Sequence, residues 1–261
     1  MNSSRQWQLN YTQDITSDIS FRIGTNVSWT HNEIEYFAEP LGGEPWQRAT
    51  GSPMSTELYY IADGIWNTQQ EIDNADAHWE GARPGDVRFT DINGDGKITA
   101  SDRKRIDENF RPDLIGGLSL GASVGQFDVA MQFQGAAQVK KYVFTSAAGT
   151  FGNYFQEFAQ NRWTPENKDA SGPRAYQRDD AYWAANQNTY FLRDAKYLRL
   201  KSARLGYSLP TDWAPGFRQV EVYLSGRNLF TMTPINIIDP ESGIHTYPPE
   251  RTFTVGIQMG L

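Results

Sequence analysis

Apolar and polar residues alternate with a period of two in seven stretches of the chain, as in β-strands whose two faces meet different surroundings. The clearest stretch is residues 252–261, where every second side chain is large and apolar: Phe253, Val255, Ile257, Met259 and Leu261. The other six stretches are residues 6–11, 21–29, 117–124, 127–134, roughly 190–209 and roughly 219–230. The pattern predicts an all-β protein with seven strands that are apolar on one face.

Short and long connections alternate strictly between the predicted strands. Short turns are expected near residues 16–20, 125–126 and 210–217, and long segments at residues 31–113, 137–188 and 231–250. Compact soluble domains rarely contain structureless loops of this length, whereas outer-membrane barrels combine short periplasmic turns with long extracellular loops. We therefore predict an antiparallel transmembrane β-barrel segment with long extracellular loops, whose last strand runs towards the periplasm.

Seven strands are too few to close a wide barrel, because large transporters of this kind have about 22. An open edge in lipid would leave backbone groups unpaired, so the chain is expected to be part of a larger barrel. A soluble β-sandwich remains an alternative, because a half-buried sheet gives the same alternation. In that case the protein would be a calcium-stabilised module that binds carbohydrate.

Composition narrows the function classes. Aromatic residues make up 13% of the 261 residues, which suits wide strand surfaces, interfacial girdles or sugar binding. The formal net charge is −7 and no stripe of Lys and Arg forms, so a nucleic-acid partner is not expected. The absence of cysteine excludes a disulfide scaffold or a thiolate metal site. No apolar run approaches the ~20 residues of a transmembrane helix, and the first residues lack the apolar core of a secretory signal.

One segment, within residues 86–109, matches the spacing of a calcium-binding loop. Oxygen-bearing side chains fall at positions 1, 3, 5 and 12 of the template, position 7 would offer its main-chain carbonyl, and position 9 a hydroxyl or a bridging water. Gly96 occupies the sixth position, where the template requires a sharp turn. The six candidate ligands are Asp91, Asn93, Asp95, Lys97, Thr99 and Asp102. We expect a structural, non-catalytic Ca²⁺ site that stabilises a long external loop.

Two features of this loop differ from an EF-hand. Position 12 is Asp102 instead of the longer glutamate, and residues 87–90 look extended where an EF-hand has a helix. The alternative is a turn rich in Asx and Gly residues, capped into a short helix over residues 102–109.

Other chemical groups give weaker signals. The histidines share no spacing typical of a metal site or a catalytic triad: His31, His78 and His245. A secreted glycoside hydrolase would need a pair of carboxylates, and the candidate pairs are Asp239 with Glu241 and Asp73 with Asp76. Carboxylates in loops are mostly solvated, which argues against catalysis by either pair. The protein is therefore not expected to be an enzyme. Aromatic residues of the long segments could stack on sugar rings, contact a partner protein or pack within the loops: Trp46, Tyr59, Tyr60, Trp66, Trp79, Tyr154, Phe155 and Phe158.

Several segments resemble the SusC-like branch of TonB-dependent outer-membrane transporters. Residues 84–96 (PGDVRFTDINGDG) are similar to its PGD…DINGDG segment, and residues 116–135 resemble its paired strands ending in FQG. Residues 161–167 (NRWTPEN) resemble its RWTPEN loop, and residues 191–201 (FLRDAKYLRLK) its FLRDASYLRLKN strand. LGYSLP, GRNLFT and DPE follow in the family's order, at residues 205–210, 226–231 and 239–241. The resemblance covers roughly the last two thirds of the chain.

The resemblance implies an importer in the outer membrane of Bacteroidetes, surrounded by outer-membrane lipid. Such an importer works with a SusD-like surface lipoprotein as its lid and with TonB as its source of energy, and its expected cargo is an oligosaccharide or a peptide. Residues 1–261 are then expected to be the C-terminal part of the barrel, with the plug domain and TonB box outside them. Leu261 stands where these barrels commonly end in an aromatic residue.

Overall fold

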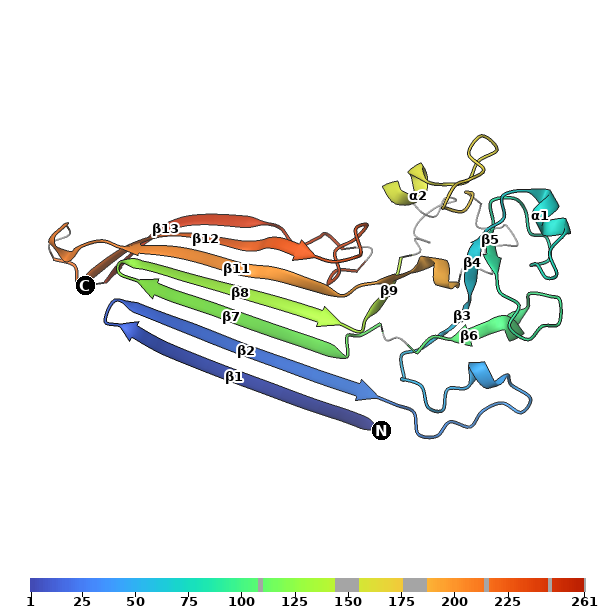
Figure 1. The fold of residues 1–261 in the computed structure, drawn as a ribbon, viewed down its shortest axis with the longest axis horizontal. Coiled ribbons are helices and arrows are strands. Elements are labelled where there is room, and N and C mark those ends of the chain that lie inside the picture. The colour runs from blue at the N-terminus through green and yellow to red at the C-terminus, as the bar shows by residue number, and fades with distance from the viewer. Residues whose placement is uncertain (108–109, 144–154, 176–186, 214–215, 244–245, 261) are drawn as a thin grey trace. The chain divides into compact units, whose positions relative to one another are not determined.

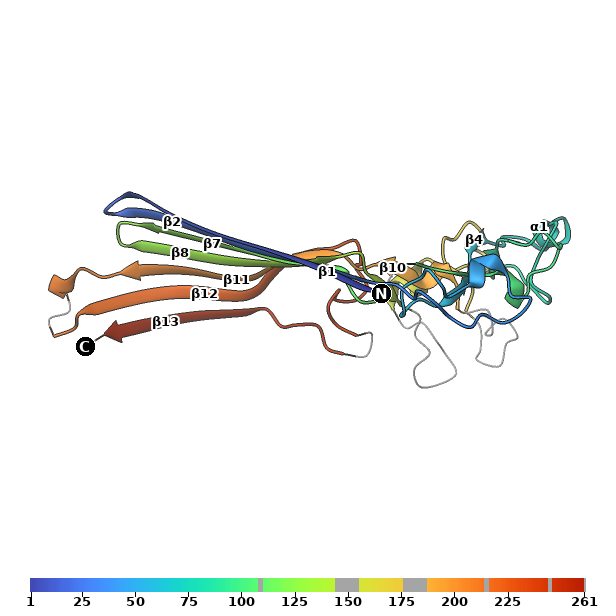
Figure 2. The ribbon, with the colours of Figure 1, turned by 90° about the horizontal axis from the view of Figure 1, so that it is seen from below.

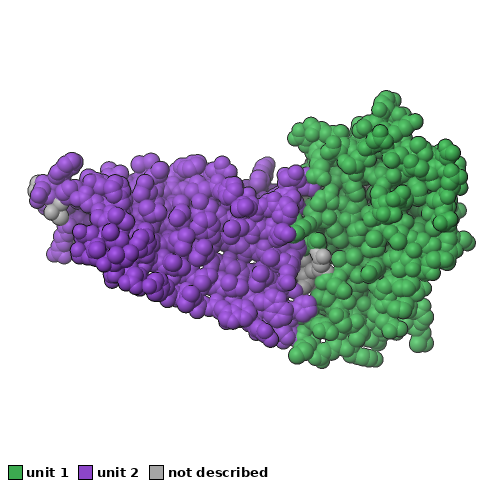
Figure 3. Space-filling model, in the orientation of Figure 1, with its two compact units in different colours: residues 1, 32–110, 140–194 green, residues 2–31, 111–139, 195–261 purple. Residues whose placement is uncertain are grey.

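The protein forms two compact units, which Figure 3 shows in different colours. The computed structural model describes residues 1–107, 110–143, 155–175, 187–213, 216–243 and 246–260. Unit 1 comprises Met1 and residues 32–110 and 140–194, so it is made almost entirely of two long connections. Unit 2 comprises residues 2–31, 111–139 and 195–261 and contains all seven long strands.

Unit 2 is one antiparallel sheet of seven strands, in the order β1-β2-β7-β8-β11-β12-β13 (Figure 1). The strands are β1 (Asn2–Thr16), β2 (Ile19–Asn32), β7 (Leu114–Val124), β8 (Phe127–Ala137), β11 (Tyr197–Ser208), β12 (Gln219–Met232) and β13 (Thr252–Gly260). Each of these strands overlaps one of the predicted alternating stretches, so the seven predicted strands are confirmed. Gly125 supplies the positive φ of 58° in the tight β7–β8 turn, and the β11–β12 turn contains a short 3₁₀ helix, η5 (Thr211–Trp213).

Short and long connections lie at opposite ends of this sheet, as predicted. Two residues join β1 to β2 and two join β7 to β8, whereas the β2–β7 and β8–β11 connections supply unit 1. The predicted strand over residues 190–209 is corrected at its beginning. Its first part forms η4 (Thr189–Phe191) and β10 (Leu192–Asp194), which belong to unit 1, and the sheet strand begins only at Tyr197.

The strand register places apolar side chains on one face of the sheet and polar ones on the other. Directly opposed residues of antiparallel neighbours share a face, and the pairing aligns apolar residues in rows across strands. One row contains Val129, Leu205, Leu224 and Val255. The register shifts between Leu200 and Ser202, where Asn228 of the facing strand has a φ of 52°.

The apolar face of unit 2 has no protein layer over it within the described residues. Viewed from the edge, the sheet is a single layer (Figure 2). Val255 is 76% exposed, Ile257 62% and Leu224 50%, although all three are large apolar side chains in a regular strand. A soluble sandwich would bury these side chains between two sheets. The β-sandwich alternative is therefore not supported.

Unit 1 has a buried core of the usual kind, so the long connections are not structureless. Its two-stranded ribbons pair β3 (Leu58–Tyr60) with β6 (Arg103–Arg105), β4 (Ala62–Ile65) with β5 (Val87–Phe89), and β9 (Lys140–Tyr142) with β10. Short helices are α1 (Gln69–Asp73), α2 (Gln156–Gln160), η1 (Pro45–Gln47) and η2 (Ala100–Asp102). The core contains Tyr60, Trp66, Ile72, Ala82, Val87, Phe89 and Ile98. None of the helices that the structure describes is long and apolar enough to cross a membrane.

Candidate functional site

The polar face of the seven-stranded sheet carries charged residues that pair across strands. Arg22 of β2 lies 3.0 Å from Asp128 of β8, which also accepts a hydrogen bond of 2.8 Å from the Ser123 hydroxyl. Arg204 of β11 pairs with Glu221 of β12 at 3.0 Å. Charged groups are stable on a sheet face that meets water. This face therefore suits a water-lined wall.

Arg199 is the most deeply buried charged residue of this face. It is 1% exposed, and it forms ion pairs with Asp239 and, at 2.6 Å between Nη1 and Oε2, with Glu241. Both carboxylates come from the connection between β12 and β13. We call these three residues the Arg199 cluster.

Neighbouring side chains add hydrogen bonds to the Arg199 cluster. The Tyr197 hydroxyl donates to Glu241 at 2.7 Å, and the Gln134 amide donates to the same carboxylate oxygen at 3.2 Å. The Arg199 Nε donates to the Thr231 hydroxyl at 2.9 Å. The cluster thus fastens the β12–β13 connection to the polar side of β8, β11 and β12. The sequence offered Asp239 and Glu241 as a possible hydrolase pair and as part of the DPE segment of the family resemblance, and the cluster gives them a positioning role.

The other residues weighed for catalysis occupy separate places. Asp73 accepts a hydrogen bond of 2.9 Å from the Gln69 amide within α1. His31 lies 2.7 Å from Asp113, and the His78 ring lies 3.0 Å from the Trp79 carbonyl oxygen. His245 lies outside the described residues.

The calcium-type loop lies in unit 1, and its acidic residues accept hydrogen bonds from the loop's own backbone. Asp91 accepts from the amide groups of Gly94 at 2.7 Å and Gly96 at 2.9 Å. Slight burial raises the pKa of Asp91, but hydrogen bonds from the Gly96, Gly94 and Asp95 amides outweigh it, so the pKa lies below its ordinary value. Asn93 and Asp95 each accept from the amide two residues further on.

Asp102, the last residue of the calcium-type loop, joins the two ends of the loop by hydrogen bonds. Its side chain is fully buried and accepts hydrogen bonds from the amides of Ile92 at 2.9 Å and Thr99 at 2.8 Å. Thr99 caps η2, and residues 103–105 then form β6, so the predicted helix over residues 102–109 does not form there. The predicted extended segment before the loop is confirmed as β5.

The fit of this loop to a metal is limited by the direction of its carboxylates. In the part of the chain that the structure describes, no three His, Cys, Asp or Glu side chains converge into a group that could hold a metal ion. Each loop acid still has lone pairs beyond those used by the amides. The loop therefore offers the oxygen ligands that Ca²⁺ prefers, in a conformation that hydrogen bonds from the loop amides already fix.

Most of the aromatic residues singled out in the long segments pack within unit 1. Tyr59, Tyr60, Trp66 and Phe158 are buried, and the Trp46 ring nitrogen donates to the Ser101 carbonyl at 2.9 Å. Tyr154 lies outside the described residues. Among the described residues of this unit, the large exposed aromatics are Tyr36 and Phe37, which the sequence pattern did not single out.

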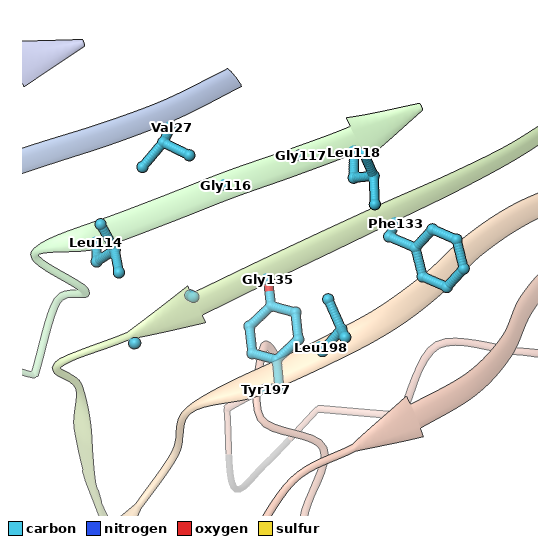
Figure 4. Close-up of a pocket in the computed structure, with 11 residues that line it drawn as sticks. Val27, Leu114, Gly116, Gly117, Leu118, Phe133, Gly135, Tyr197 and Leu198 are labelled. Carbon is cyan, nitrogen blue, oxygen red and sulfur yellow. The ribbon is translucent and has the colours of Figure 1, made fainter. Parts of the chain in front are cut away.

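A hollow of about 320 Å³ lies on unit 2 where glycines of neighbouring strands face each other (Figure 4). Gly116 of β7 and Gly135 of β8 are directly paired, so neither places a side chain on the apolar face. Leu114, Leu118 and Leu198 are among the residues around the gap. Its lining is almost entirely apolar, which does not suit a sugar or a charged peptide.

We expect Arg199→Gln to free the β12–β13 connection, because it removes the guanidinium that pairs with both Asp239 and Glu241 and leaves Glu241 with the more distant Lys201, at 3.6 Å. Removing one partner of a buried ion pair costs about 3–5 kcal/mol. Hydrogen exchange of residues 233–243 should become faster, while exchange in the β7–β8 ladder stays unchanged. Arg227→Gln is the matched control, because Arg227 is exposed on β12 and forms no ion pair among the described residues. Unchanged exchange of residues 233–243 in Arg199→Gln would refute the positioning role.

No family model matches the chain, but curated proteins and solved structures do. The chain is 32% identical over 227 residues to the TonB-dependent receptor P26 of Formosa agariphila, which covers 79% of this chain and 22% of that protein. It is 26% identical over 282 residues to the TonB-dependent receptor SusC of Bacteroides thetaiotaomicron, which covers 99% of this chain and 26% of that protein. The chain thus spans about a quarter of the length of these relatives.

The fold matches solved structures over nearly the whole chain. The structure of the RagAB peptide transporter has a TM-score of 0.70 at 22% identity, and covers 99% of this chain and 29% of that one. The RagAB peptide importer in its open-open state gives a TM-score of 0.68 at 23% identity. The matched relatives, and a sheet that has the wall architecture of their barrel, show that this chain belongs to the SusC-like TonB-dependent transporters.

Proposed function

We propose that the protein imports nutrients across the outer membrane and that unit 2 is a section of its barrel wall. The observation that carries this proposal is the uncovered apolar face of a regular seven-stranded sheet, opposite a face with charged pairs. In a barrel wall the apolar face contacts acyl chains and the polar face lines a water-filled lumen. The names of the relatives, TonB-dependent receptor and SusC, support the same function.

The long connections then lie outside the cell, and the short turns face the periplasm. The long connections fold around a buried core, which gives unit 1 the rigidity to shape an external vestibule. By analogy with its relatives, the protein takes up oligosaccharides or peptides together with a SusD-like lipoprotein and draws energy from TonB. The solved neighbours are described as a peptide transporter and importer, which supports transport without fixing the substrate of this protein. No described cluster favours enzymatic chemistry.

We also propose that the loop of residues 91–102 binds Ca²⁺ in a structural role. The support is its oxygen-bearing residues at template spacing and the positive φ of Gly94 and Gly96, 72° and 79°, which allow the sharp turn. Asp91, Asn93, Asp95 and Asp102 would supply side-chain oxygens, with Lys97 and Thr99 as the remaining ligands. A bound ion would rigidify unit 1 between β5 and β6.

The importer function is tested with an arginine placed on either face of β13. Val255→Arg is expected to abolish insertion and uptake, because a lipid-facing Arg near the bilayer midplane costs about 2–4 kcal/mol. Thr254→Arg is the matched control. Thr254 directly precedes Val255 in the sequence, but it lies on the polar face of the sheet, where it pairs with Ser225. Cells that lack the gene should lose uptake of a labelled oligosaccharide or peptide, and the wild type and Thr254→Arg should restore it. Equal restoration by Val255→Arg would contradict the proposed wall, and undiminished uptake without the gene would contradict import.

The calcium proposal is tested by calorimetry on the full-length protein after removal of divalent ions. The wild type is expected to bind one more Ca²⁺ than Asp91→Ala, because position 1 is a central ligand of the template. Glu33→Ala, at an exposed acid of the same unit, is the control and should keep the wild-type number. The proposal fails when Asp91→Ala and the wild type take up equal numbers of ions.

A further inference from the structure

Glycines on the polar face of unit 2 are covered by polar side chains of neighbouring strands. At five of them, such a side chain comes within 3.2 Å of the position that a Cβ atom would occupy. A glycine therefore lets the long side chain beside it lie along the sheet instead of projecting from it. The pairs, with the glycine first, are Gly24 with Asn10, Gly117 with Asn26, Gly121 with Arg22, Gly206 with Glu221 and Gly256 with Tyr223.

Tyr223 is the largest of these side chains and has a glycine opposite it on either side. It is paired with Gly206 of β11 and with Gly256 of β13, the two strands that flank β12 (Figure 1). A Cβ atom on Gly256 would lie 2.5 Å from the Tyr223 hydroxyl oxygen and 2.8 Å from the ring carbon Cε1. The ring therefore lies directly over the backbone of Gly256, in space that any other residue would fill.

Two charged side chains hold the Tyr223 ring in this position. The Arg204 guanidinium lies over the ring, 4.5 Å from its centroid, which is the geometry of a cation–π contact. Arg204 also pairs with Glu221 at 3.0 Å, and the Glu221 carboxylate occupies the space over Gly206. The ring is thus confined on the β11 side by Glu221 and across its face by Arg204.

This arrangement lies towards the end of the sheet that carries the short turns. Gly206 comes two residues before the end of β11, and Gly256 comes four residues before the end of β13. In the proposed wall this end faces the periplasm. Cargo that moves along the polar face would therefore pass Tyr223 as it leaves the lumen.

A methyl group at position 256 would displace the Tyr223 ring. The β13 backbone is held by its ladder with β12, so the side chain is the part that moves. Glu221 already occupies the space over Gly206, and Arg204 covers the face of the ring. We expect the displaced ring to turn away from the sheet and into the lumen.

We propose that Tyr223 determines the size of the cargo that passes this wall. Held along the sheet by Gly256 and Arg204, the ring leaves the passage open, and displaced from Gly256 it obstructs long cargo. This inference rests on the proposed import function and adds a residue that sets its size limit. The effect is steric, so it applies to an oligosaccharide and to a peptide alike.

The position of the ring is tested without any cargo, by nitration of the full-length protein in detergent. Tetranitromethane modifies accessible tyrosine rings at the carbon beside the hydroxyl, and mass spectrometry of peptides gives the rate at each tyrosine. Tyr223 is expected to react slowly in the wild type and faster in Gly256→Ala, while the exposed Tyr247 serves as the internal reference. Gly116→Ala is the matched control on the apolar face, because an added methyl there meets only ordinary contact distances, 3.5 Å or more.

The size limit is tested by uptake into cells that lack the gene and carry one variant each. The probes are labelled glucose oligomers, xylose oligomers and alanine peptides, each as a series of increasing length, and uptake is counted per molecule at the cell surface. Gly256→Ala is expected to lose uptake of the longer members and to retain the shorter ones. The double variant Gly256→Ala/Tyr223→Ala should regain the longer members, because it keeps the methyl group and removes the ring. Gly116→Ala should import the whole series as the wild type does.

Four results would overturn the role of Tyr223. They are equal nitration of Tyr223 in the wild type and Gly256→Ala, wild-type uptake of every length by Gly256→Ala, failure of the double variant to regain the longer members, and absence of Gly256→Ala from the cell surface. The last result counts because a ring that moves aside leaves the wall intact. Wild-type cells that import no probe faster than gene-deleted cells would instead refute import itself, and the size limit with it.

Discussion

The structure depends on one constraint: a single-layer sheet cannot bury its apolar face against the protein itself. In unit 2 the backbone groups of the inner strands are satisfied by the ladders, but no layer of the described residues covers the apolar side chains of the seven strands. Leaving such a face in water would cost about 25 cal/mol for each Å² of apolar surface. A lipid environment removes this cost, and the proposed location and function follow from that requirement.

The two units solve the problem of burial in different ways. Unit 1 folds around aromatic and aliphatic residues such as Tyr60, Trp66 and Phe89, as a water-soluble domain does. Unit 2 carries cross-strand ion pairs on one face, Arg22 with Asp128 and Arg204 with Glu221, and its apolar residues on the other. The Arg199 cluster extends this polar face by holding a connection against it. One chain thus contains one unit suited to water and one unit whose apolar face is suited to lipid.

Local pattern was sufficient to predict the existence of the strands, because a period of two runs through a part of each, although in β1 (Asn2–Thr16) it was recognised over residues 6–11 alone. It was not sufficient at residues 190–196, where the alternation continues although Leu192 and Asp194 pair with β9 in the other unit. The Arg199 cluster joins residues forty positions apart, and no local pattern encodes such a contact. The exposed aromatics Tyr36 and Phe37 were missed because they lie in an irregular segment without periodicity. The spacing at residues 91–102 predicts a calcium site, whereas the structure reveals only how its backbone is held.

The most direct measurement of the central claim is a nitroxide scan along β13 of the full-length protein in lipid bilayers. The chain lacks cysteine, so single cysteines placed at residues 252–260 can be labelled one at a time within it. Collisions with oxygen, which concentrates in lipid, should peak at positions 253, 255, 257 and 259. Collisions with a water-soluble nickel complex should peak at the positions between them. Equal water access on both faces, or protection of the odd positions from both reagents, would contradict contact between the apolar face and lipid.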